Sequence, residues 1–531
     1  MRFLPGLAFL AILPGLPAAQ CPVSKVTAAD SAVLDRFGWA LDLAGDTLFV
    51  GAPLDNIVGR NTGSVHVFER DGLNWFLKTK LVAPDAHQGQ VFGTKLASDG
   101  RHLAVCASRM EFAASHGPGV LYVYEERGRG FELVARLGPI GATPRPEDLF
   151  GIDLALEGDW LFAGAPHDSE SSPDLGAVHV FHRTGGVWVP HGKLTPTVPE
   201  RGTLFGSSIA LDGERLVVGA PWNSSRAPNG GAAHVFERVG SEWIERERLF
   251  PAESRTEAIF GSGVALDGTT IACGAEYDDQ RGAVHVLEFD KGAWVESTKL
   301  APSFLDRPGL LGRELAFAGG RLLATAIGHG ANGVVLQFAR SGSSWALEEV
   351  IEPEDAPAIP GLDFFGWDLA ASGDLVAIGA PWNDQRSSDA GAVYVRCATN
   401  RLCATLSSPR ETSWGKQRLE IDRGAANAGH FYWLAGSMSG TSPGIRFRGL
   451  RIPLNVDTYF RSLIAAPNQG WVTNNLGLLD ASGRATVELR VPPESYAALV
   501  GLTFHHAFAE LGPSGLEHVS NAVPLFFGAR H

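Results

Sequence analysis

Four histidines occupy matching places in four similar segments, and histidine is a common zinc ligand and a common general base. The segments read "SVHVF", "AVHVF", "AAHVF" and "AVHVL", and the histidines are His66, His179, His234 and His285. Two further segments of this kind carry a tyrosine in the same place, Tyr122 and Tyr394. Whether the histidines do chemistry together depends on whether the fold brings the segments to one point.

A second set of polar side chains follows the motif Gly-Ala-Pro or a variant of it. An Asp or Asn stands two residues beyond the motif in five segments, as Asp55, Asp168, Asn223, Asp278 and Asn383. Two other segments have lost both Gly-Ala-Pro and this residue, and carry Met110 and His329 instead. The joint loss predicts a turn in which the side chain bonds nearby backbone amides.

These residues belong to an internal repeat of roughly 55 residues. Each copy begins with Phe-Gly, at 37–38, 92–93, 150–151, 205–206, 260–261 and 365–366, with Leu311-Gly312 as a seventh. Four short apolar runs follow, separated by Gly, Asp and Ser turn residues, as expected for four strands. We number the copies one to seven by these starts. Seven four-stranded units predict a β-propeller, because ring closure lets each sheet cover its neighbour.

The seventh copy ends after its third strand, at "GAVYVRC", and lacks the last one. The missing strand stands at the other end of the chain, where "SKVTAAD" matches "TKLVAPD" of the first copy. We therefore expect residues 22–28 to complete blade seven. The same geometry predicts a disulfide between Cys21 and Cys397, with Cys397–Cys403 as the alternative, and it leaves Cys106 and Cys273 buried and unpaired.

The repeated units resemble the FG-GAP family, the seven-bladed propellers typified by the integrin α-subunit head, and they are most similar to its secreted bacterial branch. The resemblance implies an extracellular propeller for adhesion or ligand recognition, usually without catalysis. Integrin-type repeats often carry a calcium loop of the form Asp-x-Asp-x-Asp-Gly between the first two strands. Here those turns, such as "LAGDTL" and "LDGERL", hold at most two carboxylates, so we expect no calcium and no other cofactor.

The propeller decides how the candidate residues are interpreted. Equivalent histidines lie on separate sheets about 10 Å apart or more, so we expect a packing position and no metal site. In each copy, the residue after Gly-Ala-Pro begins the loop between the second and third strands. These loops lie on the same face of the ring as the loops that connect one blade to the next. Aromatic or histidine side chains gather there, and they form either a floor for a sugar or peptide or, as we prefer, packing over neighbouring blades: Trp39, His167, Trp222, Tyr277, Trp367 and Trp382.

Composition narrows the function classes. The 531 residues carry a net charge of −14, which argues against nonspecific binding to nucleic acid or to an anionic membrane. Residues 1–20 read as a signal peptide with Arg2, an apolar stretch and the small pair Ala18-Ala19. No later segment has 18 uncharged apolar residues in a row. We expect a secreted or cell-surface protein without an integral membrane segment in the mature chain; lipidation of Cys21 is the alternative, disfavoured by Gln20.

The last part of the chain, residues 399–531, loses the repeat and has strand-like runs that suggest a β-sandwich. Asp480 to Gly483, between two alternating runs, predicts a hairpin there. The predicted fold class is therefore all-β: a propeller over 21–398 followed by this sandwich.

No Gly-x-Ser-x-Gly, His-Glu-x-x-His, P-loop or Cys-x-x-Cys motif is present. We therefore expect an exported, non-catalytic recognition or adhesion protein whose partner is an extracellular protein or glycan. The alternative is an extracellular hydrolase or lyase with its site at the mouth of the propeller channel.

Overall fold

The computed structural model describes residues 24–398, apart from residues 31, 72–73, 109–117, 129, 142–143, 331, 343, 354–362 and 385–387, and beyond residue 398 the strands and short turns named below. The chain divides into two compact units, Val23–Thr399 and a second unit that contains Asn400–His531. Among the described residues, no helix is long and apolar enough to span a bilayer.

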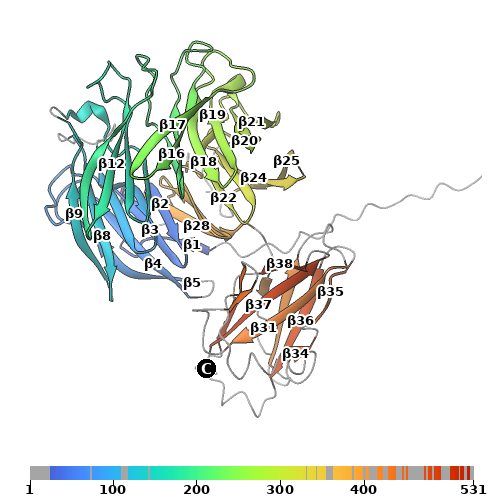
Figure 1. The fold of residues 1–531 in the computed structure, drawn as a ribbon. Helices are drawn as coiled ribbons and strands as arrows, with labels where there is room; N and C mark the ends of the chain where they lie inside the picture. The colour runs from blue at the N-terminus through green and yellow to red at the C-terminus, as the bar shows by residue number, and fades with distance from the viewer. Residues whose placement is uncertain are drawn as a thin grey trace, which may run out of the picture. The chain divides into compact units, whose positions relative to one another are not determined.

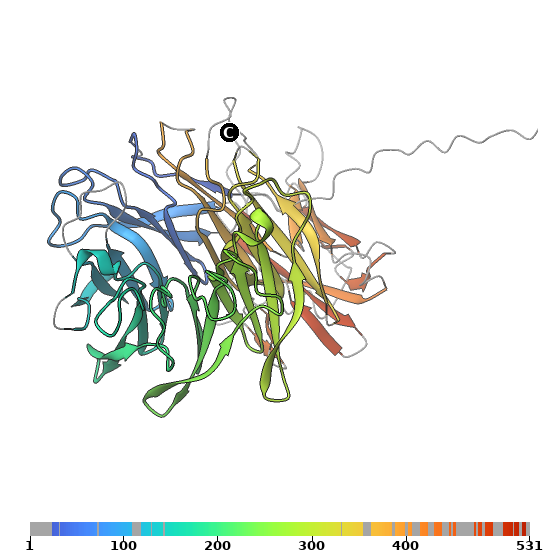
Figure 2. The ribbon, with the colours of Figure 1, turned by 90° about the horizontal axis from the view of Figure 1, so that it is seen from above.

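The described strands of the first unit form seven four-stranded antiparallel sheets, the blades of a propeller (Figures 1 and 2). Blade one is β2 (Ala40–Ala44), β3 (Thr47–Ala52), β4 (Ser64–Asp71) and β5 (Asn74–Leu81); blade two is β6 (Phe92–Ser98), β7 (His102–Ala107), β8 (Val120–Arg127) and β9 (Gly130–Leu137); blade three is β10 (Leu154–Glu157), β11 (Trp160–Ala165), β12 (Ala177–Thr184) and β13 (Val187–Leu194). Blade four is β14 (Ile209–Asp212), β15 (Arg215–Ala220), β16 (Ala232–Val239) and β17 (Glu242–Leu249); blade five is β18 (Phe260–Asp267), β19 (Thr270–Ala275), β20 (Ala283–Asp290) and β21 (Ala293–Leu300); blade six is β22 (Leu311–Ala318), β23 (Arg321–Ala326), β24 (Val334–Ser341) and β25 (Ser344–Ile351).

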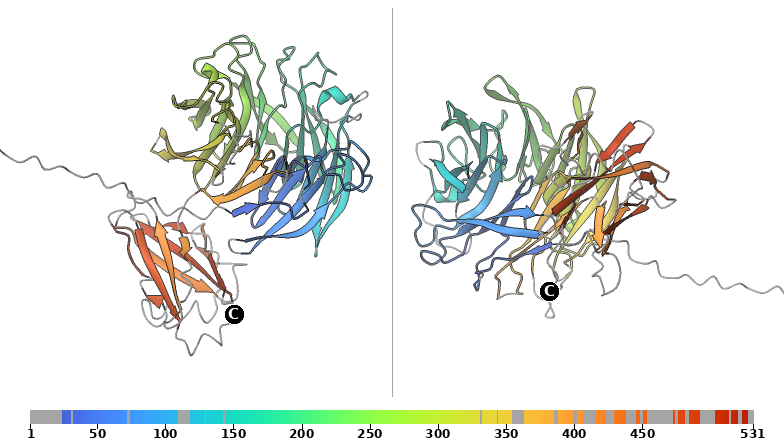
Figure 3. Two further views of the ribbon diagram at one scale, coloured as in Figure 1. Left: turned by 180° about the vertical axis from the view of Figure 1, so that it is seen from behind. Right: turned by 90° about the horizontal axis from the view of Figure 1, so that it is seen from below.

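Blade seven joins the two ends of the repeat region. β26 (Leu369–Ser372), β27 (Leu375–Ala380) and β28 (Ala392–Cys397) form its first three strands. The fourth is β1 (Ser24–Val26), which pairs antiparallel with β28 and lies beside it in Figures 1 and 3. The N-terminal segment thus supplies the strand that the seventh copy lacks.

The burial pattern explains why the sequence forms these strands. The second strands β7 and β19 are buried at every residue, since neighbouring blades cover both faces of each sheet. The outermost strands, such as β17 and β21, alternate between buried and exposed side chains over most of their length, as strands at the rim must.

Phe-Gly and Gly-Ala-Pro meet at the contact between neighbouring blades. Phe37 is fully buried, and its backbone bridges to Gly391 of blade seven. A Cβ atom on Gly51 of the motif would clash with the carbonyl oxygen of Gly93 in blade two, and one on Gly379 would clash with that of Gly38. The two motifs are therefore the two halves of one close backbone contact, which recurs at the five seams where the glycine of Gly-Ala-Pro or Gly-Ala-Glu is kept, including the seam that closes the ring.

Phe-Gly opens the inner strand in only some blades. The inner strand begins at the motif in blades two, five and six, whereas in blade one it begins at Ala40, after it. The glycine takes a positive φ in both cases, +90° at Gly38 and +96° at Gly93, so the motif makes the same turn between blades wherever the strand begins.

The cysteines of the propeller are recorded with free thiols. Cys106 on β7 and Cys273 on β19 are fully buried and unpaired, which confirms that prediction. Cys397, at the end of β28, is also buried and free in this structure. Cys21 lies outside the described residues and nothing is described of the Cys403 side chain, so both disulfide pairings stay predictions.

The second unit contains two described antiparallel sheets and a hairpin. One sheet has the order β29 (Leu402–Thr405), β30 (Gly415–Asp422), β36 (Arg484–Val491) and β34 (Val472–Thr473). The other has the order β35 (Leu476–Leu478), β31 (Phe431–Ser437), β37 (Thr503–Gly512) and β38 (Gly515–Val519), with β39 (Val523–Phe526) on β37, and the hairpin is β32 (Ile445–Phe447) with β33 (Leu450–Ile452). Packing of the two sheets as a sandwich stays a prediction.

The hairpin predicted around Asp480 to Gly483 is wrong. β35 pairs with β31 and β36 pairs with β30, so the strands on either side of this turn belong to different sheets. The alternating pattern identified the strands, but it carries no information on their partners.

Candidate functional site: the mouth of the central channel

A channel with a cavity of about 480 Å³ lies at the centre of the propeller, because residues of all seven inner strands line it. Four of its charged side chains, Lys95, Asp153, Glu314 and Asp368, come from one place in the repeat, three residues after the first residue of the Phe-Gly motif or its Leu-Gly variant. Six of the residues in that place line the cavity: Lys95, Asp153, Ser208, Gly263, Glu314 and Asp368. Sequence reasoning missed this ring because the side chain differs in nearly every copy. The signal was the fixed offset from Phe-Gly.

Lys95 is the ionic centre of the channel. Its Nζ lies 3.2 Å from Asp368 Oδ1, 3.4 Å from Asp153 Oδ1 and 3.9 Å from Glu314 Oε1. Burial by itself would lower the pKa of Lys95, but the attraction of Asp368, Glu314 and Asp153 raises it well above its usual value. One lysine thus links blade two to blades three, six and seven.

Two of these carboxylates also bind backbone amides of the next blade. Asp368 Oδ2 accepts the Leu41 N–H at 2.6 Å, and Asp153 Oδ2 accepts the Ile209 N–H at 2.6 Å. An inner strand is the edge of its sheet, so its amides need partners from outside the sheet. Asp153 and Asp368 therefore have a structural role at the seams between blades.

Two other carboxylates are held towards their protonated form. Burial raises the pKa of Asp42 to about 7, against hydrogen bonds from backbone amides, and it raises the pKa of Glu314 to about 8. Asp42 Oδ2 is buried without a hydrogen-bond partner. Burial also raises the pKa of Glu276, against the attraction of Arg313, and both of these residues line the channel.

Three exposed aromatic rings lie in loops of blades four and five, and one of them lines the channel cavity. Trp222 lines the cavity and is 51% exposed, and Tyr277, which follows the channel residue Glu276, is 48% exposed. They occupy the same repeat position in the adjacent blades four and five. Phe304 in the loop after blade five is also exposed, with its ring 5.9 Å from His329. No aromatic residue occupies the position of Phe304 in the other copies, so its exposed ring could not be anticipated from the repeat.

The other predicted aromatic residues are packed. Trp39, Trp367 and Trp382 contact one another at the seam of blades seven and one, with ring centroids 4.7–5.4 Å apart. Arg36 covers Trp382 at 4.3 Å and Arg313 covers Trp367 at 4.4 Å. The structure brings these three tryptophans together as a seam cluster whose rings pack on each other and on arginine.

His167 is engaged in its own loop, where its Nδ1 lies 3.2 Å from Asp174 Oδ1. The expected arc therefore divides into the packed seam cluster, the loop contact of His167 and the exposed pair Trp222 and Tyr277.

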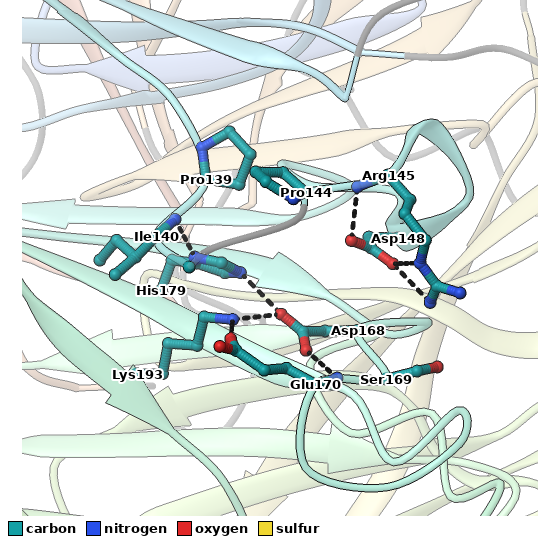
Figure 4. Close-up of a pocket in the computed structure, with 11 residues that line it drawn as sticks. Pro139, Ile140, Pro144, Arg145, Asp148, Asp168, Ser169, Glu170, His179 and Lys193 are labelled. Carbon is teal, nitrogen blue, oxygen red and sulfur yellow. Dashed lines mark hydrogen bonds and ion pairs between the residues drawn. The ribbon is translucent and has the colours of Figure 1, made fainter.

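The Asp and Asn residues after Gly-Ala-Pro do more than shape a turn. In blade three Asp168 Oδ1 accepts the Glu170 N–H at 3.0 Å, whereas its Oδ2 binds Lys193 Nζ at 2.7 Å and faces His179 Nε2 at 3.4 Å (Figure 4). Together these side chains border a small cavity of about 190 Å³. The Ile140 N–H donates to His179 Nδ1, so this histidine has no free ring nitrogen to act as a base.

The same connection from loop to outer strand recurs around the ring. Asp55 binds Lys80 at 2.7 Å, Asp278 binds Lys299, and Asn383 Oδ1 accepts from Lys25 Nζ at 3.0 Å. Asn223 instead keeps the turn role, since its Oδ1 accepts the Ser225 N–H at 3.0 Å. In most copies the outer strand ends in Lys-Leu or Arg-Leu, which can be read from the sequence. That the lysine binds the Asp or Asn after Gly-Ala-Pro could not be read from it.

The four histidines of the third strands lie in four separate blades and are buried. Burial lowers the pKa of His66 to about 4, so that ring is neutral at neutral pH. Burial likewise lowers the pKa of His179, whereas for His285 the carboxylates of Asp278 and Glu296 outweigh burial and raise it. Within the described residues, no group of three or more His, Cys, Asp or Glu side chains is placed to hold a metal ion.

Comparison with known proteins agrees with the repeat. The FG-GAP repeat family matches residues 22–68, 188–236, 243–287 and 345–396. A search of curated proteins found no match. Among solved structures, a chain of "Crystal Structure of Mitotic Checkpoint Complex" is 16% identical with a TM-score of 0.43, covering 74% of this chain and 99% of that one. A protein assigned as a 6-phosphogluconolactonase from Bacteroides uniformis is 12% identical with a TM-score of 0.41, covering 59% of this chain and 83% of that one.

Four segments match the family directly, and the described strands form seven four-stranded blades around them. The propeller of this chain contains FG-GAP repeats in these four segments.

Proposed function

We propose that the protein is an exported recognition protein that binds an extracellular protein or glycan at the mouth of its central channel. The observation that carries the proposal is the exposed ring of Trp222, which lines a cavity of about 480 Å³, with Tyr277 exposed at the same repeat position in the next blade. Large aromatic side chains supply much of the binding energy of recognition sites, and in a monomer such rings are normally buried. The signal-like residues 1–20 and the acidic net charge support an extracellular partner over nucleic acid.

The packing of the aromatic rings favours Trp222 and Tyr277 over the seam cluster as the place where a ligand binds. The rings of Trp39, Trp367 and Trp382 already have partners in each other and in two arginines, so a ligand would have to displace these contacts. Within the described part of the chain, the rings of Trp222 and Tyr277 do not pack against another aromatic ring. We therefore place the ligand over blades four and five.

Glycan and peptide arrays probed with the full chain test the proposal. A hit is then measured with Trp222→Ala, Tyr277→Ala and, as a matched control, Phe76→Ala, since Phe76 is 56% exposed on the outer strand β5. We expect the first two variants to lose binding and the control to keep it. Equal binding by all three would reject this face as the site.

A second candidate function rests on the carboxyl groups of the channel. Burial raises the pKa of Glu314 to about 8 and that of Asp42 to about 7, which favours their protonated forms, and a carboxyl with a raised pKa is the kind of group that serves as a general acid. A hydrolase or lyase would be detected with a panel of glycoside, peptide and ester substrates. Activity that Glu314→Gln abolishes would establish it and displace the recognition proposal. We prefer recognition because Asp153 and Asp368 are occupied by Lys95 and by backbone amides.

A further inference from the structure

Tyr277, one of the two rings proposed to contact a ligand, stands at the start of a tight loop. In blade five the loop closes through the N–H of Gly282, which donates to the carbonyl of Asp278 at 2.9 Å, four positions earlier. In blade four the equivalent residues are eight positions apart. Inside the short loop Asp279 and Gln280 take left-handed φ values of +49° and +61°. A strained loop of this kind keeps its shape only where surrounding contacts hold it.

The buried side chain of Asp278 is the anchor of this loop. Its Oδ2 binds Lys299 Nζ and lies 3.7 Å from His285 Nε2. Its Oδ1 lies 3.3 Å from Arg255 Nη1. Because Tyr277 directly precedes Asp278, the contacts that fix this carboxylate also fix the backbone that carries the Tyr277 ring.

His285, buried on β20, faces a carboxylate at each ring nitrogen. Its Nε2 faces Asp278, and its Nδ1 lies 2.9 Å from Glu296 Oε1. Glu296 is itself held in place, since its Oε2 accepts the Ala252 N–H at 2.6 Å. A neutral imidazole has a single N–H, whereas the protonated ring has two. His285 can therefore serve both carboxylates only in its charged form.

This arrangement differs from that of the other three histidines in the third strands. Within the described part of the chain, each of those three lies within ion-pair distance of one carboxylate. In blade three the Ile140 N–H donates to Nδ1 of His179, which leaves Asp168 as its one carboxylate (Figure 4). In blade four Asn223 stands where blade five has Asp278. A single N–H suffices in these blades, so the need for a second one belongs to blade five.

The charged groups that face His285 favour its protonated form. Burial by itself would lower the pKa of His285, but Asp278 and Glu296 raise it above its usual value, against the repulsion of Lys299. The remaining neighbour is the uncharged ring of Phe260, which meets the imidazole edge-on with the centroids 5.4 Å apart. The electrostatics therefore agree with the two-carboxylate geometry.

We propose that protonated His285 is a positioning residue for Tyr277, because its second N–H holds Asp278 and so keeps the Tyr277 ring in place on the loop face. The inference rests on the proposed function, in which Tyr277 contacts the ligand. When His285 loses its proton, Asp278 keeps only Lys299 and Arg255, and the loop loosens. The contact is complete below the usual histidine value of 6.5 and is lost as the pH rises through the higher value of the folded chain.

Fluorine NMR of the full chain labelled with fluorotyrosine tests the positioning without any ligand. The chain has seven tyrosines, so the Tyr277 signal is assigned from its absence in Tyr277→Phe. Its chemical shift and transverse relaxation rate are followed from about pH 5.5 to about pH 8.5. We expect the signal to move, and its relaxation to slow as the ring gains mobility, with a midpoint above 6.5. A Tyr277 signal that does not change with pH would overturn the proposal.

Two variants assign the titration to this pair of side chains. His285→Gln keeps an N–H for Asp278 at every pH, and Asp278→Asn gives blade five the side chain that blade four has. Either change should abolish the pH dependence of the Tyr277 signal. His234→Gln makes the same histidine change in blade four and is the matched control, which should titrate like wild type. A titration that survives in His285→Gln or in Asp278→Asn would show that His285 does not act through Asp278.

The glycan and peptide arrays, probed at about pH 6 and about pH 8, connect the positioning to binding. We expect wild type and His234→Gln to bind about threefold more weakly at the higher pH, a change typical of residues that act through another side chain. His285→Gln should bind equally at both values. Equal binding of wild type at both values would overturn the role of His285 in recognition. If instead Tyr277→Ala binds as tightly as wild type, the proposed function fails at Tyr277, and the NMR titration alone decides the positioning.

Discussion

At the scale of single residues, Lys95 decides the charge balance of the channel. It lies within 4 Å of carboxylates from three other blades, and two of those carboxylates also hold the amides of neighbouring strands. Removing one partner of a buried ion pair leaves uncompensated charge, which costs more than the pair itself contributes.

Lys95→Met should therefore lower the free energy of unfolding by about 3–5 kcal/mol at neutral pH. The loss should shrink towards acid pH as the carboxylates become protonated. Urea unfolding at two pH values measures it, with Lys291→Met as control because Lys291 is 89% exposed. A variant as stable as the control would show that Lys95 does not link the blades.

Asp42 makes the stability of the folded chain depend on pH, and its contribution decreases as the pH rises. In the folded chain it keeps its proton up to about pH 7, whereas in the unfolded chain it releases it near 3.8. The folded state thus binds more protons between these values, and stability falls as pH rises through that window. Asp42→Asn should flatten this part of the profile, so the variant should gain midpoint temperature relative to wild type as pH rises. A variant with the wild-type slope would contradict the assignment; the exposed Asp290→Asn is the control.

At the scale of strands and turns, the contact between Phe-Gly and Gly-Ala-Pro builds each seam. Gly379 lies against Gly38 at the one seam that joins blades seven and one. A side chain there meets backbone, which cannot move aside as a flexible side chain would.

Gly379→Ala should cost about 1–3 kcal/mol of unfolding free energy. Gly130→Ala is the matched control, since nothing lies within 4 Å of a Cβ on Gly130 of the outer strand β9. Chemical denaturation of the two variants measures the difference. Equal stabilities would mean that the seam tolerates a side chain and that the close contact is not required.

The sequence predicted the pairing of strands well where they repeat and poorly where they do not. Aligning the seven copies predicted four strands per blade, because a strand pattern that recurs in every copy does not arise by chance. The alignment also predicted that the N-terminal strand β1 completes blade seven. The hairpin near Asp480 failed because its flanking strands occur once, and alternation alone does not select a partner. The ring of channel residues was not predicted for a different reason. Its residue types differ from blade to blade, although all of them stand three residues after the first residue of the Phe-Gly motif.

At the scale of the whole molecule, ring closure relies on a strand of only three described residues. The disulfide predicted between Cys21 and Cys397 would constrain nearly the whole propeller in the unfolded chain. Such cross-links typically contribute about 2–4 kcal/mol to the free energy of unfolding. Closure also fixes the loop face, since the channel and the exposed rings depend on all seven blades holding their places.

The proposed function requires that this face bind a partner through Trp222. The most direct measurement is the ratio of dissociation constants of Trp222→Ala and Phe76→Ala for a ligand found on the arrays, taken under conditions where both variants are folded. We expect Trp222→Ala to bind at least about tenfold more weakly, which corresponds to roughly 1.4 kcal/mol. Equal dissociation constants for the two variants would contradict it.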